Sequence, residues 1–198
     1  MPSQEVGLLF KKHHSLIHLS LSLTILSGLR RVTICLTKEQ ETMGLDMYLY
    51  REAYVQNWNH NPEKYKVSVK FNGNKHPFIN PDKVCYIREE VGYWRKANAI
   101  HNWIVQHCAD GVDECQDIHV EEQLLIELRD TCQKVLDDNS LADELLPTSS
   151  GFFFGSTEYD EWYFDGLKHT IDIINGALVE GELPQGVYTP SYIYRASW

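Results

Sequence analysis

Alternation of apolar and polar residues predicts the strands of this chain. Leu45, Met47 and Leu49 share one face of the segment 46–55, with tyrosines between them, which predicts a strand there. The segment 64–71 alternates strictly, which predicts a strand with one face in water, as in an antiparallel sheet. Further strands are predicted at 84–93, 117–120 and 187–198, the last pairing with an early strand, with turns or loops at 57–62, 72–83 and 109–114.

A spacing of three and four residues between apolar positions predicts helices in the second half of the chain. The clearest helix covers 121–137, where leucines, a cysteine and a valine form one apolar face. The predicted helices cover 94–107, 121–137, a short segment before Pro147, and 157–178. Together with the strands they predict a single α+β domain over 43–198, in which three to four helices pack a small, mostly antiparallel sheet.

Two predicted helix starts have the spacing of a capping box. Ser140 is followed three residues later by Asp143, and Thr157 by Asp160. The last helix is expected to bury a stripe from Tyr163 to Leu178 and to stop at Gly181 and Pro184.

The densest apolar feature is the stretch 151–167, GFFFGSTEYDEWYFDGL. Seven of its first fourteen residues are aromatic. Because aromatic side chains bury large areas, we expect these rings to lie inside and to lock two helices onto the sheet.

The first 42 residues differ from the rest. A basic stretch precedes the run 16–29, LIHLSLSLTILSGL, which has the order of a signal or anchor segment. The run is short for a membrane-spanning helix. The codons AAG and GAG can encode Lys38-Glu39 and resemble a bacterial ribosome-binding sequence, three codons before Met43. We therefore expect 1–42 to be a translated leader outside the fold, with a signal or anchor as the alternative.

Charge is spread unevenly along the chain. The net charge is −10, yet residues 110–198 alone carry four Lys or Arg against nineteen Asp or Glu. An acidic surface repels phosphate, so nucleic-acid binding is not expected, whereas a basic partner is compatible with it. The five cysteines are too few for a disulfide scaffold, which indicates a reducing cytoplasm.

A candidate ligand site follows from the mixture of aromatic, cationic and amide side chains over 93–103. On a helix, Arg95, Asn98 and Asn102 share one face, which could bind a small polar ligand. The candidate ligand-binding residues are Trp94, Arg95, Asn98, His101, Tyr159 and Asp160. A competing interpretation pairs Arg95 and Lys96 with Glu158, Asp160 or Glu161, tying two helices together.

Catalytic, metal and cofactor signatures are weak. His101 could be a general base, but a lone histidine near carboxylates is a poor signal. The turn 155–157 could hold an anion, although three carboxylates follow it, and the chain has no phosphate-binding loop motif. His107, Cys108, Cys115 and His119 do not have the spacing of a common zinc site. No catalytic residue, metal or cofactor is predicted.

Five stretches carry a resemblance to a known family: MGLDMYLY at 43–50, VGYWRKANAIHNW at 91–103, GVDEC at 111–115, LLPTSSGFFFGSTEYDEWY at 145–163 and YRASW at 194–198. Over 43–198 the chain resembles a family of small proteins encoded by tailed bacteriophages and prophages. Some members carry the label "phosphoglycerate kinase", which the residues here do not support. The resemblance implies no catalytic residues, because the family supplies none.

These observations favour a phage or prophage accessory protein of the bacterial cytoplasm that acts by binding. Its partner is expected to be a host protein or a small ligand, with no membrane involved if Met43 is the start. The alternative is a small enzyme acting on a nucleotide-like or other small polar substrate.

Overall fold

The chain folds as two units in the computed structural model. The structure describes residues 6–12, 15–26, 29–37, 44–55, 60, 62, 66–151, 153–179, 181, 183 and 188–198. The units are Met1–Met43 and Gly44–Trp198. The first contains an antiparallel sheet of β1 (Val6–Lys12), β2 (Ser15–Leu26) and β3 (Leu29–Thr37), in that order. Among the described residues, no helix has the length and apolar content needed to cross a membrane.

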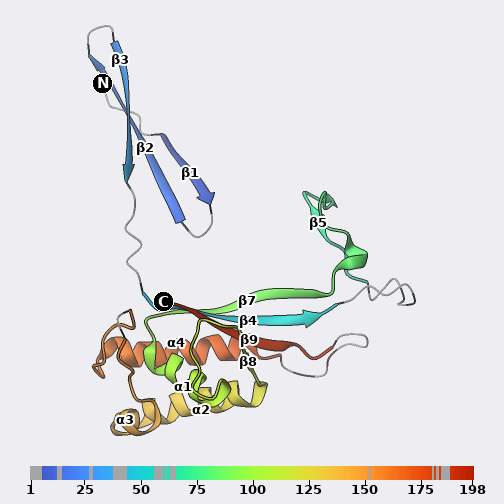
Figure 1. Ribbon diagram of the computed structural model, residues 1–198, viewed down its shortest axis with the longest axis vertical. Helices are drawn as coiled ribbons and strands as arrows, with labels where there is room; N and C mark the ends of the chain where they lie inside the picture. Colours follow the sequence, from blue (N-terminus) through green and yellow to red (C-terminus); the bar gives the residue numbers. More distant parts are fainter. Residues whose placement is uncertain are drawn as a thin grey trace. The chain divides into compact units, whose positions relative to one another are not determined.

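The second unit is built on a four-stranded antiparallel sheet. Its order is β7-β4-β9-β8, so the last strand of the chain pairs with an early strand, as predicted, and that strand is β4. The strands are β4 (Asp46–Tyr54), β7 (Tyr86–Arg95), β8 (Ile118–Val120) and β9 (Ser191–Ser197). The helices lie on one face of this sheet (Figure 1). They are α1 (Asn98–Cys108), α2 (Glu122–Asp137), α3 (Ala142–Leu145) and α4 (Glu161–Ala177), with short 3-10 turns at Pro81–Lys83 and Asn139–Leu141. The predicted α+β class is confirmed.

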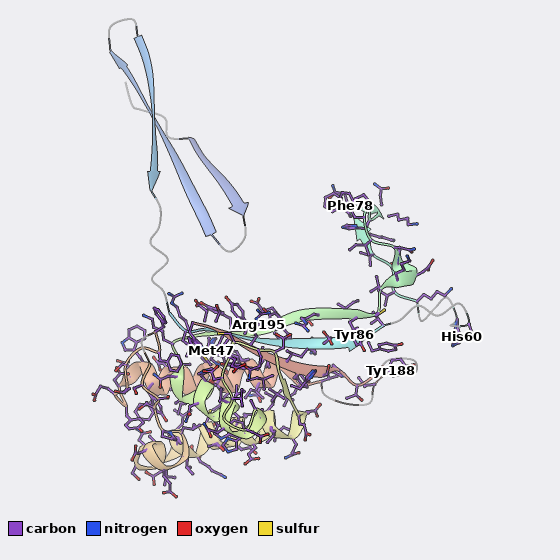
Figure 2. The ribbon with its side chains drawn as sticks, viewed as in Figure 1. Met47, His60, Phe78, Tyr86, Tyr188 and Arg195 are labelled. Atoms are coloured by element: carbon purple, nitrogen blue, oxygen red, sulfur yellow. The ribbon has the colours of Figure 1, made fainter. Side chains whose placement is uncertain are left out.

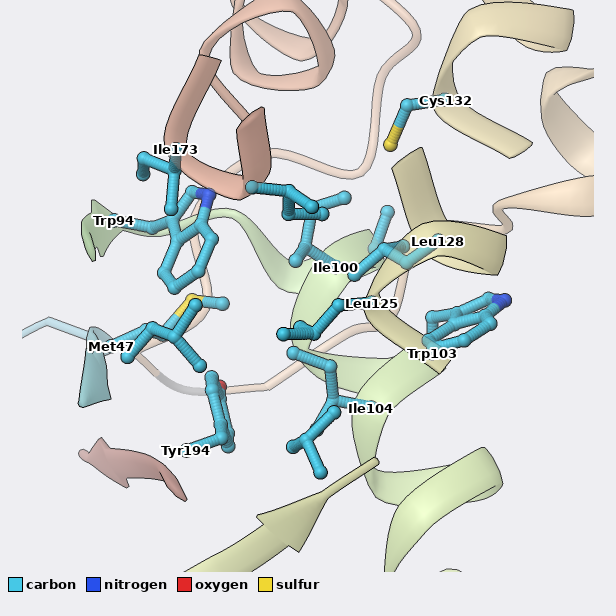
Figure 3. Packing of buried hydrophobic residues seen from close by; sticks show 14 of the residues in the cluster. Met47, Trp94, Ile100, Trp103, Ile104, Leu125, Leu128, Cys132, Ile173 and Tyr194 are labelled. Atoms are coloured by element: carbon cyan, nitrogen blue, oxygen red, sulfur yellow. The ribbon is translucent and has the colours of Figure 1, made fainter. Parts of the chain in front are cut away.

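The core lies between the sheet and these helices (Figure 3). Leu45, Met47 and Leu49 are fully buried on the helix-facing side of β4, as their alternation predicted. The apolar face of α2 is confirmed as well, because its leucines, Cys132 and Val135 lie in the same cluster. Gly92 lets α4 approach β7, since a Cβ at this position would collide with Ile173.

Two predicted elements are wrong. In the segment predicted as a strand over 64–71, residues 66–69 are irregular, and only β5 (Lys70–Phe71) pairs, with β6 (Asn74–Lys75). Alternation alone did not make a longer strand: Val67 and Val69 are half-buried, but pairing between the described residues of this region is limited to β5 and β6. Asn72 and Gly73 both have positive φ, 50° and 77°, which suits a tight hairpin turn.

The start of the predicted helix 94–107 is also wrong. Trp94 and Arg95 end strand β7, and the helix begins only at Asn98. Pairing with β4 keeps these two residues extended. They lie four and three residues before Asn98, a spacing that a helix would also place on one face.

Both predicted capping boxes are wrong. Asp160, not Thr157, caps α4, and its carboxylate accepts a hydrogen bond from the backbone N–H of Tyr163. Asp138 accepts from the backbone N–H of Ser140 and caps the preceding 3-10 turn. In both places an aspartate replaces the predicted hydroxyl side chain, which is an equally good cap.

The aromatic stretch 151–167 is not the interior of the domain. Phe154, Tyr163 and Phe164 are only partly buried against the core, and the Trp162 side chain is 84% exposed. The deepest aromatic residues are instead Trp94, Tyr192 and Tyr194 on the sheet. Phe152, Pro184 and most of the predicted turn 57–62 lie outside the described residues.

Candidate ligand site

A cavity of about 350 Å³ lies where the start of α1 meets the start of α4. Its wall comes from three segments: the end of β7 with the first turn of α1, the loop before α4, and the first turns of α4. The lining residues are Arg95, Lys96, Ala97, Asn98, Ala99, Ile100, Thr148, Gly155, Ser156, Glu158, Asp160, Trp162, Tyr163, Gly166 and Leu167. Segments 95–100 and 148–167, far apart in the sequence, therefore meet here.

The backbone turns sharply on both sides of the cavity. Lys96 has φ 57°, which reverses the chain between β7 and α1, and its N–H donates to Leu45 O. Gly155 has φ 90° and lies so close that a Cβ there would be 3.0 Å from the Lys96 Cβ. Only glycine fits this φ and this approach without strain. The two turns hold the walls of the cavity at a fixed separation.

Asn98 is a structural clamp and not a free ligand-binding group. Its amide donates to Phe154 O at 3.0 Å and to Ser156 O at 2.8 Å. Its carbonyl oxygen accepts from the Ser149 backbone N–H at 3.0 Å. Because the side chain is buried and both N–H groups are used, Asn98 shapes the cavity by fixing the loop that forms one wall.

Arg95 lies at the cavity but is paired elsewhere. Its guanidinium contacts the Asp46 carboxylate at 3.1 Å, and Tyr93 Oη donates to the same carboxylate at 2.5 Å. The predicted pairing of Arg95 with Glu158, Asp160 or Glu161 is therefore wrong. The reason is the extended backbone at the end of β7, which directs Arg95 to its neighbour on β4.

Trp94 and Tyr159 do not line the cavity. Trp94 is buried and donates from its indole N–H to Thr170 Oγ1 at 2.9 Å. Tyr159 donates from its hydroxyl to Asp143 at 2.8 Å. The structure thus brings Arg95, Asn98 and Asp160 together at one cavity, and it places the other predicted residues outside it.

His101 lies in the interior, within a chain of hydrogen bonds. Its Nδ1 is 2.7 Å from Tyr194 Oη, and its Nε2 is 2.9 Å from Asp113 Oδ2. The neutral tautomer that satisfies both donates from Nε2 to the carboxylate and accepts from the tyrosine. Burial, with the Asp113 carboxylate nearby, raises the pKa of Tyr194 well above its usual 10.0. Neither His101 nor Tyr194 lines the cavity, so this triad joins α1 to β9 rather than facing a substrate.

The remaining groups at the start of α4 are also held in place. Asp160 uses Oδ1 as the helix cap. Tyr163 donates its hydroxyl to Leu146 O at 2.9 Å, and burial raises its pKa above the usual 10.0. Both side chains therefore have a partner within the fold.

Among the lining residues outside the predicted ligand-binding set, four matter most for binding: Lys96, Glu158, Trp162 and Gly166. Lys96 and Glu158 have no ion pair within the part of the chain that the structure describes. Trp162 is 84% exposed at the rim. A Cβ added to Gly166 would meet no atom within 4 Å, so the wall is open there. A glycine inside an otherwise regular helix was the one available signal.

A second hollow, of about 410 Å³, lies between β7 and α4. Its Arg51 pairs with Glu89 at 2.7 Å, and His169 contacts Tyr93 O at 3.0 Å. Arg51, Glu89 and His169 thus already have partners within the fold, which makes this hollow the weaker candidate. Across the described ranges, no three His, Cys, Asp or Glu residues are grouped to hold a metal.

Comparisons with protein-family models, curated proteins and solved structures found no match for the chain. The geometry of the cavity is therefore the main guide to the function of this protein.

Proposed function

We propose that the chain is a binding protein whose ligand site is the cavity between the starts of α1 and α4, and that its occupant is a small polar molecule. The cavity itself carries this proposal. Its volume of about 350 Å³ lies within the usual range for small-molecule sites. The setting that we propose is the cytoplasm of a bacterium, where the chain would serve a phage or prophage as an accessory protein.

The chemistry of the wall supports a ligand that carries charge and a flat group. The Lys96 ammonium and the Glu158 carboxylate have no ion pair among the described residues and can each contact an opposite charge. The Trp162 indole offers a stacking surface at the rim. Ala97, Ile100 and Leu167 supply the apolar remainder.

Binding is favoured over catalysis by what the lining groups already do. Asp160 caps a helix, Tyr163 donates to a backbone carbonyl, Asn98 clamps a loop and Arg95 pairs with Asp46. His101, the candidate base, faces the interior. A general acid or base has to reach the proton that it transfers, and these groups are engaged in the fold.

Gly166 allows a sharp test of the site. Gly166→Leu adds a side chain into the open wall without a clash at Cβ. Gly176→Leu is the matched control, because Gly176 lies in the same helix, meets no atom within 4 Å of an added Cβ, and does not line this cavity. Both variants should fold, since replacing a helical glycine stabilises by about 0.5–1 kcal/mol.

The measurement is mass spectrometry for small molecules that co-purify from bacterial cells, followed by thermal-shift titration with the compounds found. We expect wild type and Gly176→Leu to bind and Gly166→Leu to lose at least about tenfold in affinity. Equal binding by both variants would place the ligand elsewhere. If nothing co-purifies and a host protein is captured through Trp162 instead, the partner is a protein and the small-ligand proposal is wrong.

A further inference from the structure

The hairpin region between β4 and β7 differs in charge from the rest of the second unit. We call residues 66–83 the basic arm. It contains four lysines against one aspartate, a net charge of +3, whereas residues 110–198 carry four basic against nineteen acidic residues. Figure 1 shows β5 beyond the helices, at the far end of the long β4–β7 pair. The basic arm is therefore positively charged although the chain as a whole is negatively charged.

Aromatic rings form a row on the basic arm. The ring centroid of His76 is 6.1 Å from that of Phe71 and 6.0 Å from that of Phe78. The Phe78 side chain is 92% exposed and that of Phe71 is 58% exposed, and Figure 2 shows Phe78 on the arm, apart from the helices. Exposed apolar rings are unfavourable in water, and the free energy falls when a partner covers them.

The row is held in place by hydrogen bonds of its own. His76 Nδ1 accepts from the backbone N–H of Phe78 and from that of Ile79, both at 3.2 Å. The His76 backbone N–H donates to Val69 O, which ties the two sides of the arm together. The rings are therefore presented by an ordered turn, so less conformational entropy is lost when a ligand stacks on them.

Lysines lie next to the rings along the chain. Lys70 and Lys75 face each other across the β5–β6 pair, on the side of the hairpin opposite to Phe71, and Lys83 closes the arm. None of the three has an ion pair within the described part of the chain. Exposed aromatic faces beside unpaired cations are the combination with which proteins hold unpaired nucleotides, through stacking on bases and attraction to phosphates.

We propose that the basic arm binds single-stranded nucleic acid, with bases stacked on Phe71 and Phe78 and phosphates beside Lys70, Lys75 and Lys83. The acidic remainder of the domain repels phosphate and confines the strand to the arm. The arm offers no helix for a major groove, and its rings need unstacked bases, so a single strand fits better than a duplex. An acidic protein would use the lysines but leave the flat faces of the rings without a stacking partner.

The experiment measures fluorescence anisotropy of labelled oligothymidylate and oligouridylate, each of about twelve nucleotides, with the full chain at about 50 mM salt. We expect dissociation constants below about 100 μM and a slope of log K against log salt near −2, as expected for three phosphate contacts on a single strand. Phe78→Ala should weaken binding at least about fivefold. Lys70→Glu with Lys75→Glu should abolish it.

Trp198→Ala is the matched control, because Trp198 is also an exposed aromatic residue, at 45%, but belongs to the acidic segment 110–198 and lines neither the basic arm nor the cavity. It should bind like the wild type. Absence of binding by wild type up to about 100 μM would overturn the proposal. So would equal or tighter binding of a duplex of the same length. If Phe78→Ala instead changes the sedimentation coefficient and not oligonucleotide binding, the arm is a contact between copies of this chain and the proposal is wrong.

Discussion

Two regions of the second unit differ in how they place aromatic side chains. One is the helical body, meaning the sheet β7-β4-β9-β8 with its helices, which buries several of them. The other is the basic arm, which exposes them. Trp94 is 2% exposed in the body, whereas Phe78 is 92% exposed on the arm. Each of these residues has another aromatic residue nearby in the sequence. The difference is that Trp94 reaches α4 through its hydrogen bond to Thr170, whereas among the described residues the ring contact of Phe78 is with His76 of its own arm. Apolar residues become buried only where another element of the fold packs against them.

Charge separates the two regions as clearly as burial does. The arm has a net charge of +3 over 66–83, and the segment 110–198 has a net charge of −15. Whole-chain charge averages these regions and describes neither. Each region has to be matched with its own class of partner: we propose a small polar ligand for the cavity in the body and a polyanion for the arm.

The largest expected effect is the loss of stability when a buried ring is removed, compared with the removal of an exposed one. Trp94→Ala removes a buried indole and its hydrogen bond to Thr170 and should lower the free energy of unfolding by about 3–5 kcal/mol. Phe78→Ala should change it by less than about 0.5 kcal/mol, because the ring lies in solvent. Urea unfolding followed by circular dichroism measures both. A comparable loss in the two variants would show that the arm is packed in solution.

Asn98 sharpens the description of the cavity wall. Asn98→Ala should destabilise by about 2–3 kcal/mol, because Ser149 N–H and two loop carbonyls lose their partner. Asn102→Ala, four residues along the same helix, should lie within about 0.5 kcal/mol of wild type. Both values come from denaturant unfolding. If Asn98→Ala keeps full stability, the loop does not depend on this clamp.

The body should also lose stability in alkaline solution. Burial raises the pKa of the Cys132 thiol from its usual 9.0 to about 12, so the folded state keeps a proton that the unfolded state releases. The resulting stabilisation is complete below pH 9 and is lost as pH rises from 9 to 12. Cys132→Ala should make the slope of unfolding free energy against pH shallower by up to about 1.4 kcal/mol per pH unit in this range. Identical slopes in variant and wild type would mean that the thiol is not buried.

The smallest expected effect concerns the first unit. A chain that starts at Met43 should keep the melting temperature of the second unit, because the core cluster, among the side chains that the structure describes, lies between Leu45 and Ala196. Differential scanning calorimetry of both chains measures this. A large drop would show that the first unit stabilises the second. N-terminal sequencing of protein from its natural source tests the separate expectation that synthesis begins at Met43.

Much of the fold could be predicted from local pattern. The alternation of Leu45, Met47 and Leu49 identified the buried face of β4, and the spacing in α2 identified its core side. The pairing of the last strand with an early strand was also predicted, and the structure identifies that strand as β4. These succeeded because each element has one apolar face and periodicity reports which face that is.

The site was predicted only in part, and tertiary structure decided the rest. The sequence by itself brought Arg95, Asn98 and Asp160 forward as binding residues, and all three line the cavity. It could not show that Asn98 and Arg95 already have partners within the fold or that His101 is buried. Nor could it show that the Trp162 side chain is exposed and that Gly166 faces open space. Periodicity records which residue types recur on one element. Partners and empty space depend on which other elements pack against it, and those lie tens of residues away in the chain.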